Sequence, residues 1–320
     1  MQAKPGTAFH ETGNASLDEL LLDYYGSRRV ISSRKLVFDG VSGYDVYNPT
    51  APFSENGQRY LAARIEHRGG ETDSYAGFFF DNNGAWRFDD DIGALRGQDP
   101  KVARIGSEWV VSVVDARPTF QAEGGLEWSQ IFYRGGTLGT LRPFAKGPDL
   151  YKGIVIGVHG EQPFAFTRPM GGDFGNGRIG FRYIGSLDNL EDPAFLTDSE
   201  IIGGQFPGNI FGGANAAYSS GNGCIDVLCH VAFCEPVSSE QPEMNKHYYP
   251  GVFSWNPETK EASPVRVVAS RADLLPGDSK RPGLYDVFYP GGLESVNGLT
   301  FLYGGVSDAE AQAAVITKPF

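Results

Sequence analysis

Polar and charged side chains are concentrated in five places along this chain, each where an apolar or glycine-rich run begins or ends. Their types suit chemistry on a polar or anionic ligand. Carboxylates exchange protons, guanidinium and ammonium groups bind anions, and amides both donate and accept hydrogen bonds. The five places are residues 45–53 with 64–66, residues 97–102, residues 166–172, residues 212–230 and residues 279–308.

The elements that must carry these residues are predominantly short β-strands. The 320 residues include 43 glycines and 20 prolines, and 13% are aromatic, a composition typical of many strands joined by turns. Runs such as 109–114, 154–158 and 298–303 are apolar or alternating in character. We therefore predict an all-β fold.

One helix is expected near the start of the chain. Ser16 can cap a helix over residues 17–25, with acidic residues early, as the helix dipole favours, and Gly26 as a stop. We assign residues 1–34 to this helix and its extension, and residues 35–320 to a single β-domain. No basic stretch followed by an apolar segment comes before the helix, so we expect no secretory leader and a cytoplasmic protein.

Five polar clusters, about one for each group of strands, favour a radial fold whose inner strands point into one axial pocket. A five-bladed β-propeller has this arrangement, and propellers place their sites near the axis. Aromatic residues followed by polar turns, as at 86–91, 183–188 and 253–257, fit the ends of successive blades. A β-sandwich remains an alternative on periodicity alone, although the strands outnumber those of a common sandwich.

The charge of the chain limits its partners. A formal net charge of −12 argues against a nucleic-acid partner, because a phosphate backbone requires a basic face. Any anionic ligand must therefore meet a local group of cations within an acidic protein. No apolar run approaches the roughly 20 residues that a membrane helix needs, so we expect no membrane partner.

The three cysteines do not predict a disulfide framework or a metal site. Cys224, Cys229 and Cys234 are odd in number, with four residues between neighbours, which does not match common zinc spacing. We expect free, buried thiols and no metal.

Several of the polar segments, taken in order, resemble a known enzyme family. They are Asp45-Val46-Tyr47-Asn48, Arg64-Ile65-Glu66, Gly97-Gln98-Asp99-Pro100, Thr167-Arg168-Pro169 with Gly177-Arg178-Ile179-Gly180-Phe181, and Asp286-Val287-Phe288-Tyr289-Pro290-Gly291-Gly292. They look like the β-1,2-mannosyltransferase/phosphorylases of glycosyltransferase family 108, which turn over mannogen. They are more distantly similar to the inverting β-mannoside phosphorylases of glycoside hydrolase family 130, which are five-bladed propellers. Those relatives usually have Glu-Asp-Pro-Arg where this chain has Gln98-Asp99-Pro100-Lys101.

The resemblance implies that Asp99 is the catalytic acid, acting directly or through a sugar hydroxyl. An inverting hydrolase needs two carboxyl groups about 6.5–9.5 Å apart, one of which activates water. Phosphate is already a nucleophile, so a phosphorylase can replace that second carboxylate with cations that hold phosphate in line with the anomeric carbon. The candidate phosphate-binding residues are Arg168, His230, Lys280 and Arg281.

A second group of side chains is expected to hold the sugar, because pyranose hydroxyls donate and accept hydrogen bonds together. Tyr47, Tyr289 and Tyr303 can supply the flat apolar surface that a sugar face prefers. Glu66 shares a strand face with Arg64 and could instead simply pair with it. The sugar-binding candidates are Asp45, Tyr47, Asn48, Arg64, Glu66, Asn215, Asp286, Tyr303 and Asp308.

Each candidate for the chemistry also has a purely structural interpretation. An aspartate before proline, such as Asp99, is an ordinary turn residue. His230 lies in a nearly apolar run and could be a hydrogen-bonded core histidine. Arg168 could form a surface ion pair, and the adjacent cations Lys280 and Arg281 could be solvated.

These features together predict an inverting β-mannoside phosphorylase or β-1,2-mannosyltransferase. It would interconvert β-1,2-manno-oligosaccharides and mannose-1-phosphate, or use GDP-mannose as donor. Inorganic phosphate or a sugar phosphate is then a co-substrate, and no cofactor is expected. One alternative is an inverting β-mannosidase in which Asp286 or Asp308 activates water. The other is a non-catalytic carbohydrate-binding propeller, which would tolerate the loss of Asp99.

Overall fold

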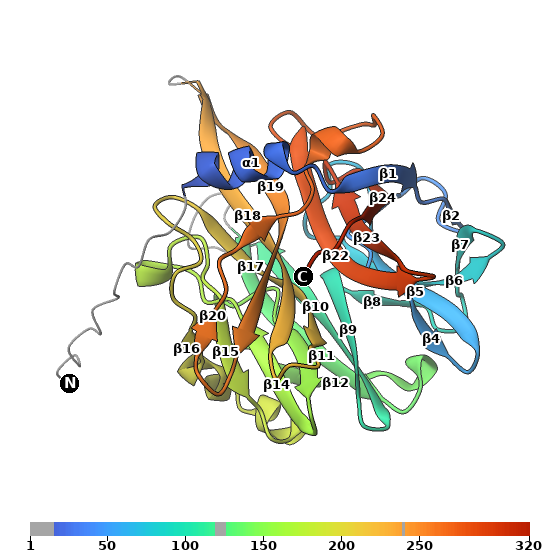
Figure 1. Cartoon of the computed structure of the whole chain (residues 1–320). Coiled ribbons are helices and arrows are strands. Elements are labelled where there is room, and N and C mark those ends of the chain that lie inside the picture. Colours follow the sequence, from blue (N-terminus) through green and yellow to red (C-terminus); the bar gives the residue numbers. More distant parts are fainter. Residues whose placement is uncertain (1–15, 119–125, 239–240) are drawn as a thin grey trace.

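The computed structural model describes residues 16–118, 126–238 and 241–320, which form strands β1 to β24 and one α-helix (Figure 1). The predicted predominance of β-structure is confirmed. Residues 1–15, on which the expectation about a secretory leader rests, lie outside this part of the chain. None of the helices within the described ranges is long and apolar enough to cross a membrane.

The helix forms where its capping signal predicts it. Helix α1 (Leu17–Gly26) begins with a capping box, in which the Ser16 side chain accepts from the Glu19 amide at 3.2 Å and the Glu19 carboxylate accepts from the Ser16 amide at 2.6 Å. The helix lies on β21 (Arg266–Val267) and buries Leu20 and Tyr24 in the apolar core. Local hydrogen bonding thus starts the helix, and one apolar face attaches it to the β-fold.

The strands form four sheets. The first contains β2 (Phe38–Asp39), β3 (Asp45–Tyr47), β4 (Phe53–Glu55), β5 (Gln58–Glu66), β6 (Tyr75–Asn82), β7 (Ala85–Phe88) and β8 (Ala94–Arg96). The second contains β9 (Gln98–Ile105), β10 (Glu108–Pro118), β11 (Leu126–Gly135) and β12 (Arg142–Lys146). The third contains β13 (Val155–His159), β14 (Gln162–Thr167), β15 (Gly180–Tyr183) and β16 (Glu200–Ile201).

The fourth sheet has nine strands and combines two antiparallel groups. They are β17 (Phe211–Ser219), β18 (Ile225–Ser238), β19 (Gln241–Asn256), β20 (Glu261–Ala262) and β21, and then β22 (Asp286–Val296), β23 (Leu299–Val306), β24 (Glu310–Ile316) and β1 (Val30–Lys35). A short parallel pairing between β19 and β22 joins the two groups. Because β1 pairs with β24, a strand from near the start of the chain completes the last group (Figure 1).

Apolar side chains fill the space between successive sheets. Phe78 of the first sheet packs in one cluster with Trp109 of the second, and Phe132 of the second packs with Ala165 of the third. Phe166 of the third sheet then packs against the fourth. Each fully buried phenylalanine contributes about 1.5–3 kcal/mol relative to exposure. The sheets therefore pack face to face in the order of the chain.

Gly291 on β22 lies so close to the segment after β3 that it has no space for a side chain. An added Cβ would overlap the Pro49 carbonyl oxygen, which is backbone and cannot rotate away. We expect Gly291→Ala to lower the free energy of unfolding by about 1–3 kcal/mol, measured by urea denaturation. Gly136→Ala is the control, because its new methyl group would meet nothing within 4 Å. Equal midpoints for the two variants would contradict this packing.

Candidate active site

A cavity of about 370 Å³ lies where side chains from all four sheets converge. Its size is in the range of small-molecule sites. Seven of the residues predicted from the sequence contribute to its wall: Asn48, Arg64, Asp99, Arg168, Arg281, Tyr289 and Asp308. Segments that are far apart in the sequence therefore form one polar site.

Asp99 is held at the start of β9 in a conformation that few residues adopt. Its φ of +50° lies in the left-handed region, and its carboxylate accepts a 2.7 Å hydrogen bond from the Asn48 amide. Arg64 Nη1 lies 3.6 Å from the same oxygen. Burial disfavours a charge here, but the Arg64 guanidinium and the Asn48 amide more than offset it and hold the pKa of Asp99 below its usual range. Asp99 is therefore ionised in the free site.

Arg64 is positioned by a buried carboxylate behind it. Glu66 accepts from Arg64 Nη2 at 2.6 Å and from Lys280 Nζ at 2.6 Å, and it also contacts the Tyr47 and Ser74 hydroxyls. Although Glu66 is buried, the Arg64 charge and these donors hold its pKa below the usual value. Glu66, Tyr47 and Lys280 thus stand behind the wall of the cavity and orient Arg64. The structural pairing of Glu66 with Arg64, left open by the sequence, is present.

Basic side chains outnumber acidic ones in the wall of the cavity. Lys152, Arg168, Lys246 and Arg281 all line it. Arg281 is paired with Glu71 at 3.0 Å, so its charge is largely compensated. In the described part of the chain, Lys152 has no carboxylate partner; its ammonium lies 4.6 Å from the centre of the Trp128 ring. Uncompensated, mutually repelling cations favour the binding of an anion.

Arg168 is the most deeply buried of these cations. It is 6% exposed, its Nη2 donates to the Asn176 carbonyl at 2.9 Å, and its buried Nε has no partner among the described residues. Burial lowers the pKa of Arg168 from its ordinary value, although a guanidinium stays charged at neutral pH. A buried donor without an acceptor costs about 1–3 kcal/mol, and the positive charge of this guanidinium in the cavity wall favours a bound anion.

His230 lies behind the cavity wall and does not line it. The Asn215 amide donates to the Pro290 carbonyl at 2.7 Å, which leaves its oxygen to accept from His230 Nδ1 at 2.7 Å. Burial, and then the nearby Arg168 charge, keep the pKa of His230 well below its usual value, so the ring is neutral. Its ring packs against Tyr248 and Tyr289 with centroids at 5.5 and 5.2 Å. His230 and Asn215 therefore support the tyrosines of the wall.

Asp308 is a second carboxyl group in the same cavity, with the opposite electrostatic character. Burial raises the pKa of Asp308 above its ordinary value, and the negative charge of Asp99 adds to this effect, while Arg64 opposes it. Asp99 and Asp308 therefore differ in the ease with which they hold a proton. Such a difference separates groups that can act as base and as acid.

Besides Tyr47, Glu66 and Asn215, three more of the predicted sugar-binding residues lie outside the cavity wall. Asp45 pairs with Arg68 near the surface. Tyr303 is on β23, a strand that does not reach the cavity, and its hydroxyl donates to Glu294 at 2.7 Å. Asp286 accepts from Tyr249 at 2.6 Å. On β22 the residues that face the cavity are 287 and 289, so strand alternation turns residue 286 away.

Among the charged and aromatic residues of the wall, the sequence did not single out Glu71, Trp128, Lys152, Lys246 and Tyr248. Lys152 had a usable signal, because Lys152-Gly153 lies shortly before β13, much as Gly97 directly precedes β9 and Asp99. Lys246 had none, since isolated lysines in polar surroundings are usually solvated.

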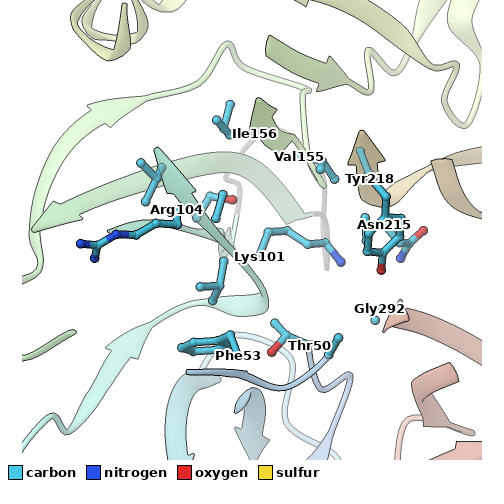
Figure 2. Close-up of a pocket in the computed structure, with 18 of the residues that line it drawn as sticks. Thr50, Phe53, Lys101, Arg104, Val155, Ile156, Asn215, Tyr218 and Gly292 are labelled. Atoms are coloured by element: carbon cyan, nitrogen blue, oxygen red, sulfur yellow. The ribbon is translucent and has the colours of Figure 1, made fainter. Parts of the chain in front are cut away.

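A second cavity of about 390 Å³ lies further along the same inner strands (Figure 2). Each of three strands passes both cavities in the same direction. On β9, residues 98 and 99 line the first cavity and residues 101–104 line the second. Residues 152 and 153, just before β13, line the first, and residues 155–158 on β13 line the second. On β22, residues 287 and 289 line the first, and residues 291–293 line the second. The two cavities therefore lie one after the other along these three strands.

The Lys152 ammonium should make anion binding depend on pH. Burial, and then the Arg168 charge, lower the pKa of Lys152 to about 7, so it is charged below that pH and neutral above it. We expect phosphate affinity to weaken above pH 7 by up to about tenfold per pH unit, and Lys152→Met to lack this dependence. Ionisation of phosphate itself is common to both proteins, so the ratio of their dissociation constants isolates the lysine. A constant ratio from pH 6 to 8 would exclude this role.

Comparison with solved structures places the chain among enzymes of one fold. The mannose phosphorylase MPT-4 of Leishmania mexicana, in complex with a phosphate ion, is 26% identical with a TM-score of 0.85, over 95% of this chain and 93% of that one. MPT-1, a GDP-Man-dependent mannosyltransferase of the same organism, is 22% identical with a TM-score of 0.84, over 95% of both chains. The β-1,2-mannobiose phosphorylase of Listeria innocua is 14% identical with a TM-score of 0.58, over 87% of this chain and 91% of that one.

The resemblance to β-mannoside phosphorylases and mannosyltransferases predicted from the sequence is therefore confirmed by the solved structures that this chain is similar to. Residues 24–320 match the family described as "Protein of unknown function (DUF1861)", and the chain belongs to that family. No curated protein sequence matches it.

Proposed function

We propose that this protein is an inverting β-mannoside phosphorylase or β-1,2-mannosyltransferase that interconverts β-1,2-manno-oligosaccharides and mannose-1-phosphate, with GDP-mannose as a possible donor. The observation that carries the proposal is the ionised carboxylate of Asp99 in the same cavity as the cations Lys152, Arg168 and Lys246. Similarity to MPT-4 over nearly the whole chain supports it. Phosphate is a co-substrate in this proposal, and no cofactor takes part.

The roles of the residues follow from their positions. Asn48, Arg64 and Asp308 line the part of the cavity around Asp99 and can bind the sugar hydroxyls, while Trp128 and Tyr289 offer flat surfaces. Lys152, Arg168 and Lys246 would hold phosphate. This division leaves the anomeric carbon between the carboxylate and the anion, the geometry that an in-line displacement requires.

Phosphorolysis then proceeds in one displacement. A proton from Asp99, passed directly or through a sugar hydroxyl, goes to the glycosidic oxygen as the bond from C1 to that oxygen breaks. A phosphate oxygen forms the new bond to C1 from the opposite face, which converts the β-linkage into α-mannose-1-phosphate. In the reverse direction ionised Asp99 accepts the proton of the attacking hydroxyl, and the cations stabilise the departing phosphate.

The depressed pKa of Asp99 fits this reversible chemistry. In the free site Asp99 is ionised and ready to act as a base. A bound phosphate would cancel part of the positive potential of Lys152 and its neighbours, which raises the pKa of Asp99 towards that of a useful acid. Phosphate binding therefore prepares the acid that phosphorolysis needs.

The same proposal extends to the architecture. Five antiparallel groups of strands, with the fourth sheet counted as two, would surround the axis as five blades of a propeller. The shared direction of the inner strands past both cavities and the pairing of β1 with β24 favour this closure. A propeller closed by its first strand also explains why β1 lies beside the end of the chain.

The direct test is product formation. Purified protein with β-1,2-manno-oligosaccharides and inorganic phosphate should release mannose-1-phosphate, and with mannose-1-phosphate or GDP-mannose and a manno-oligosaccharide acceptor it should extend the acceptor. Failure in both directions would remove the proposal.

Hydrolysis is the second candidate, because Asp308 places another carboxyl group in the cavity. The other carboxyl considered from the sequence, Asp286, lies outside the wall. If mannose is released at an equal rate without phosphate, and Asp308→Asn removes that activity, the protein is an inverting hydrolase.

A further inference from the structure

The second cavity is positively charged although the protein as a whole is strongly acidic. Among its lining residues, Lys101 and Arg104 carry charge and none is an aspartate or glutamate. The net charge of the chain is −12, so the positive charge of this lining is opposite in sign to that of the whole protein. A cavity of this charge favours an anion over a neutral ligand.

Lys101 is a buried cation that forms no ion pair in the described part of the chain. The residue is 7% exposed, and within the described ranges its ammonium group has a contact with the Tyr289 ring, 5.1 Å from the centroid, but no hydrogen bond or ion pair. Figure 2 shows its side chain extending across the cavity towards Asn215. Burial lowers the pKa of Lys101 to about 8, while the Asp99 charge opposes that effect, so the group remains mostly protonated at neutral pH. A desolvated ammonium without a partner is costly and calls for an anion.

The other polar groups of this cavity already have partners. The Asn215 amide donates to the Pro290 carbonyl, the Thr50 hydroxyl accepts from the Ala62 amide at 3.1 Å, and the Ser112 hydroxyl contacts the Ile154 carbonyl at 3.3 Å. These groups cannot neutralise the lysine. Among the described residues the Asp99 charge acts on the lysine without forming an ion pair, so an anion from solution could supply the counter-charge.

The apolar side chains of the cavity walls indicate that the ligand could have an organic part besides its anionic group. Phe53, Val155, Ile156 and Leu293 give the cavity apolar sides, and Arg104 is exposed at its margin. The volume of about 390 Å³ exceeds what a single small ion needs and is within the range of organic ligands. The shared chemistry of the possible ligands is a phosphate group, either free or attached to a small organic body.

We propose that this second cavity is a separate anion-binding site, in which the Lys101 ammonium binds a phosphate group and Arg104 attracts it from the margin. The two cavities share no lining residue, although the Lys101 ammonium also contacts the ring of Tyr289, which lines the cavity at Asp99. The inference stands independently of the proposed function, since it rests on Lys101 and its surroundings alone.

The test introduces a carboxylate near Lys101 by substitution, so that the protein itself provides a counter-charge. Ala103 lines the cavity on β9 two residues after Lys101, so both side chains are on the same face of the strand. Ala103→Glu would place a carboxylate near the ammonium and compete with any anion. Ala103→Gln has nearly the same size without the charge and is the matched control.

Binding is measured by equilibrium dialysis with labelled inorganic phosphate, and in a second series with a hexose 1-phosphate, and the positions are checked in soaked crystals. We expect phosphate at Lys101 in the wild type, in Ala103→Gln and in Arg168→Ala, and at least about tenfold weaker binding there in Ala103→Glu. Lys101→Met, a substitution of similar shape without charge, should lose this position as well. Tighter binding of the hexose 1-phosphate than of phosphate would identify a ligand with an organic body, and equal binding a free anion.

The proposal is overturned if neither probe occupies the Lys101 position in the wild type, or if Lys101→Met retains it. If Ala103→Glu does not fold, Lys101→Met still decides the question. Absence of sugar turnover with phosphate bound at Lys101 would refute the proposed function and leave this site standing.

Discussion

Asp99→Asn is expected to lower kcat/KM for phosphorolysis by about 10²–10⁴-fold, the usual contribution of general acid–base catalysis. The amide has nearly the same shape and can stay beside Asn48 and Arg64, but it cannot deliver the proton that the glycosidic oxygen needs. Synthesis from mannose-1-phosphate should fall by a similar factor, because the same group accepts the proton of the attacking hydroxyl. Both rates are measured from the formation or consumption of mannose-1-phosphate.

The matched control for this variant is Asp45→Asn. Asp45 is also an aspartate next to an arginine, but it pairs with Arg68 outside the cavity, so its loss should leave turnover within about twofold of the wild type. Sugar affinity of the Asp99→Asn protein, measured by calorimetry, should remain close to that of the wild type. An Asp99→Asn protein with full activity would refute the catalytic role. If the wild type has no activity and both proteins bind sugar equally, the protein is a carbohydrate-binding protein.

The parts of the fold that depend on local signals could be predicted from the sequence. The Ser16 capping box produces its helix because its hydrogen bonds join residues three apart. Turn residues and apolar runs likewise gave the all-β class. The five polar segments could be expected to converge because each follows or begins an apolar run, and segments at the start of strands can share one end of a radial fold.

Residues that depend on the face of a strand or on its place in the sheet could not be predicted in this way. Asp286 belongs to a segment that reaches the cavity, yet alternation along β22 gives that position to Val287 and Tyr289. Tyr303 lies on the next strand outward, where its hydroxyl pairs with Glu294. A difference of one residue or one strand decides whether a side chain lines the cavity or lies outside its wall. Composition alone does not show which of the two occurs.

Buried charge explains the remaining differences. Lys280 was expected to bind phosphate, but its ammonium is on Glu66, which the sequence suggested only as a partner of Arg64. Lys152 and Lys246, isolated in the sequence, line the cavity instead. Which lysine is neutralised inside the protein and which is left for a ligand depends on contacts between residues more than 200 positions apart, as for Lys280 and Glu66 at 214.

The cavity at Asp99 and the cavity at Lys101 are linked by the strand that they share. Asp99 and Lys101 are two residues apart on β9, and the charge of each acts on the pKa of the other. An anion at Lys101 would weaken the positive potential at Asp99 and raise its pKa, in the same direction as phosphate in the first cavity. The departure from the Glu-Asp-Pro-Arg pattern therefore falls on a residue that affects the proposed acid directly.

Arg168→Ala is expected to raise the KM for phosphate by about 10–100-fold, because a hydrogen bond to a charged group contributes about 1.5–3 kcal/mol. Arg168 is buried, carries an unpartnered Nε and lines the cavity, so its guanidinium is available to an anion. The KM for the manno-oligosaccharide should change much less, since the sugar is assigned to the Asn48 and Arg64 side. Initial rates with each substrate varied in turn separate the two constants.

Two further variants distinguish binding from a general loss of structure. Arg182→Ala removes another arginine, whose ion pair with Asp198 at 3.4 Å lies outside the cavity, and should leave the phosphate KM unchanged. Arg168→Lys keeps the charge but loses the planar donor pair, so its phosphate KM should fall between those of the wild type and Arg168→Ala. Removal of the Arg168 charge also relieves the repulsion on Lys152, so the pH at which phosphate binding weakens should move above 7 in Arg168→Ala. An unchanged phosphate KM together with an unchanged pH profile would show that phosphate binds elsewhere, because no anion could occupy this cavity without responding to its most buried cation.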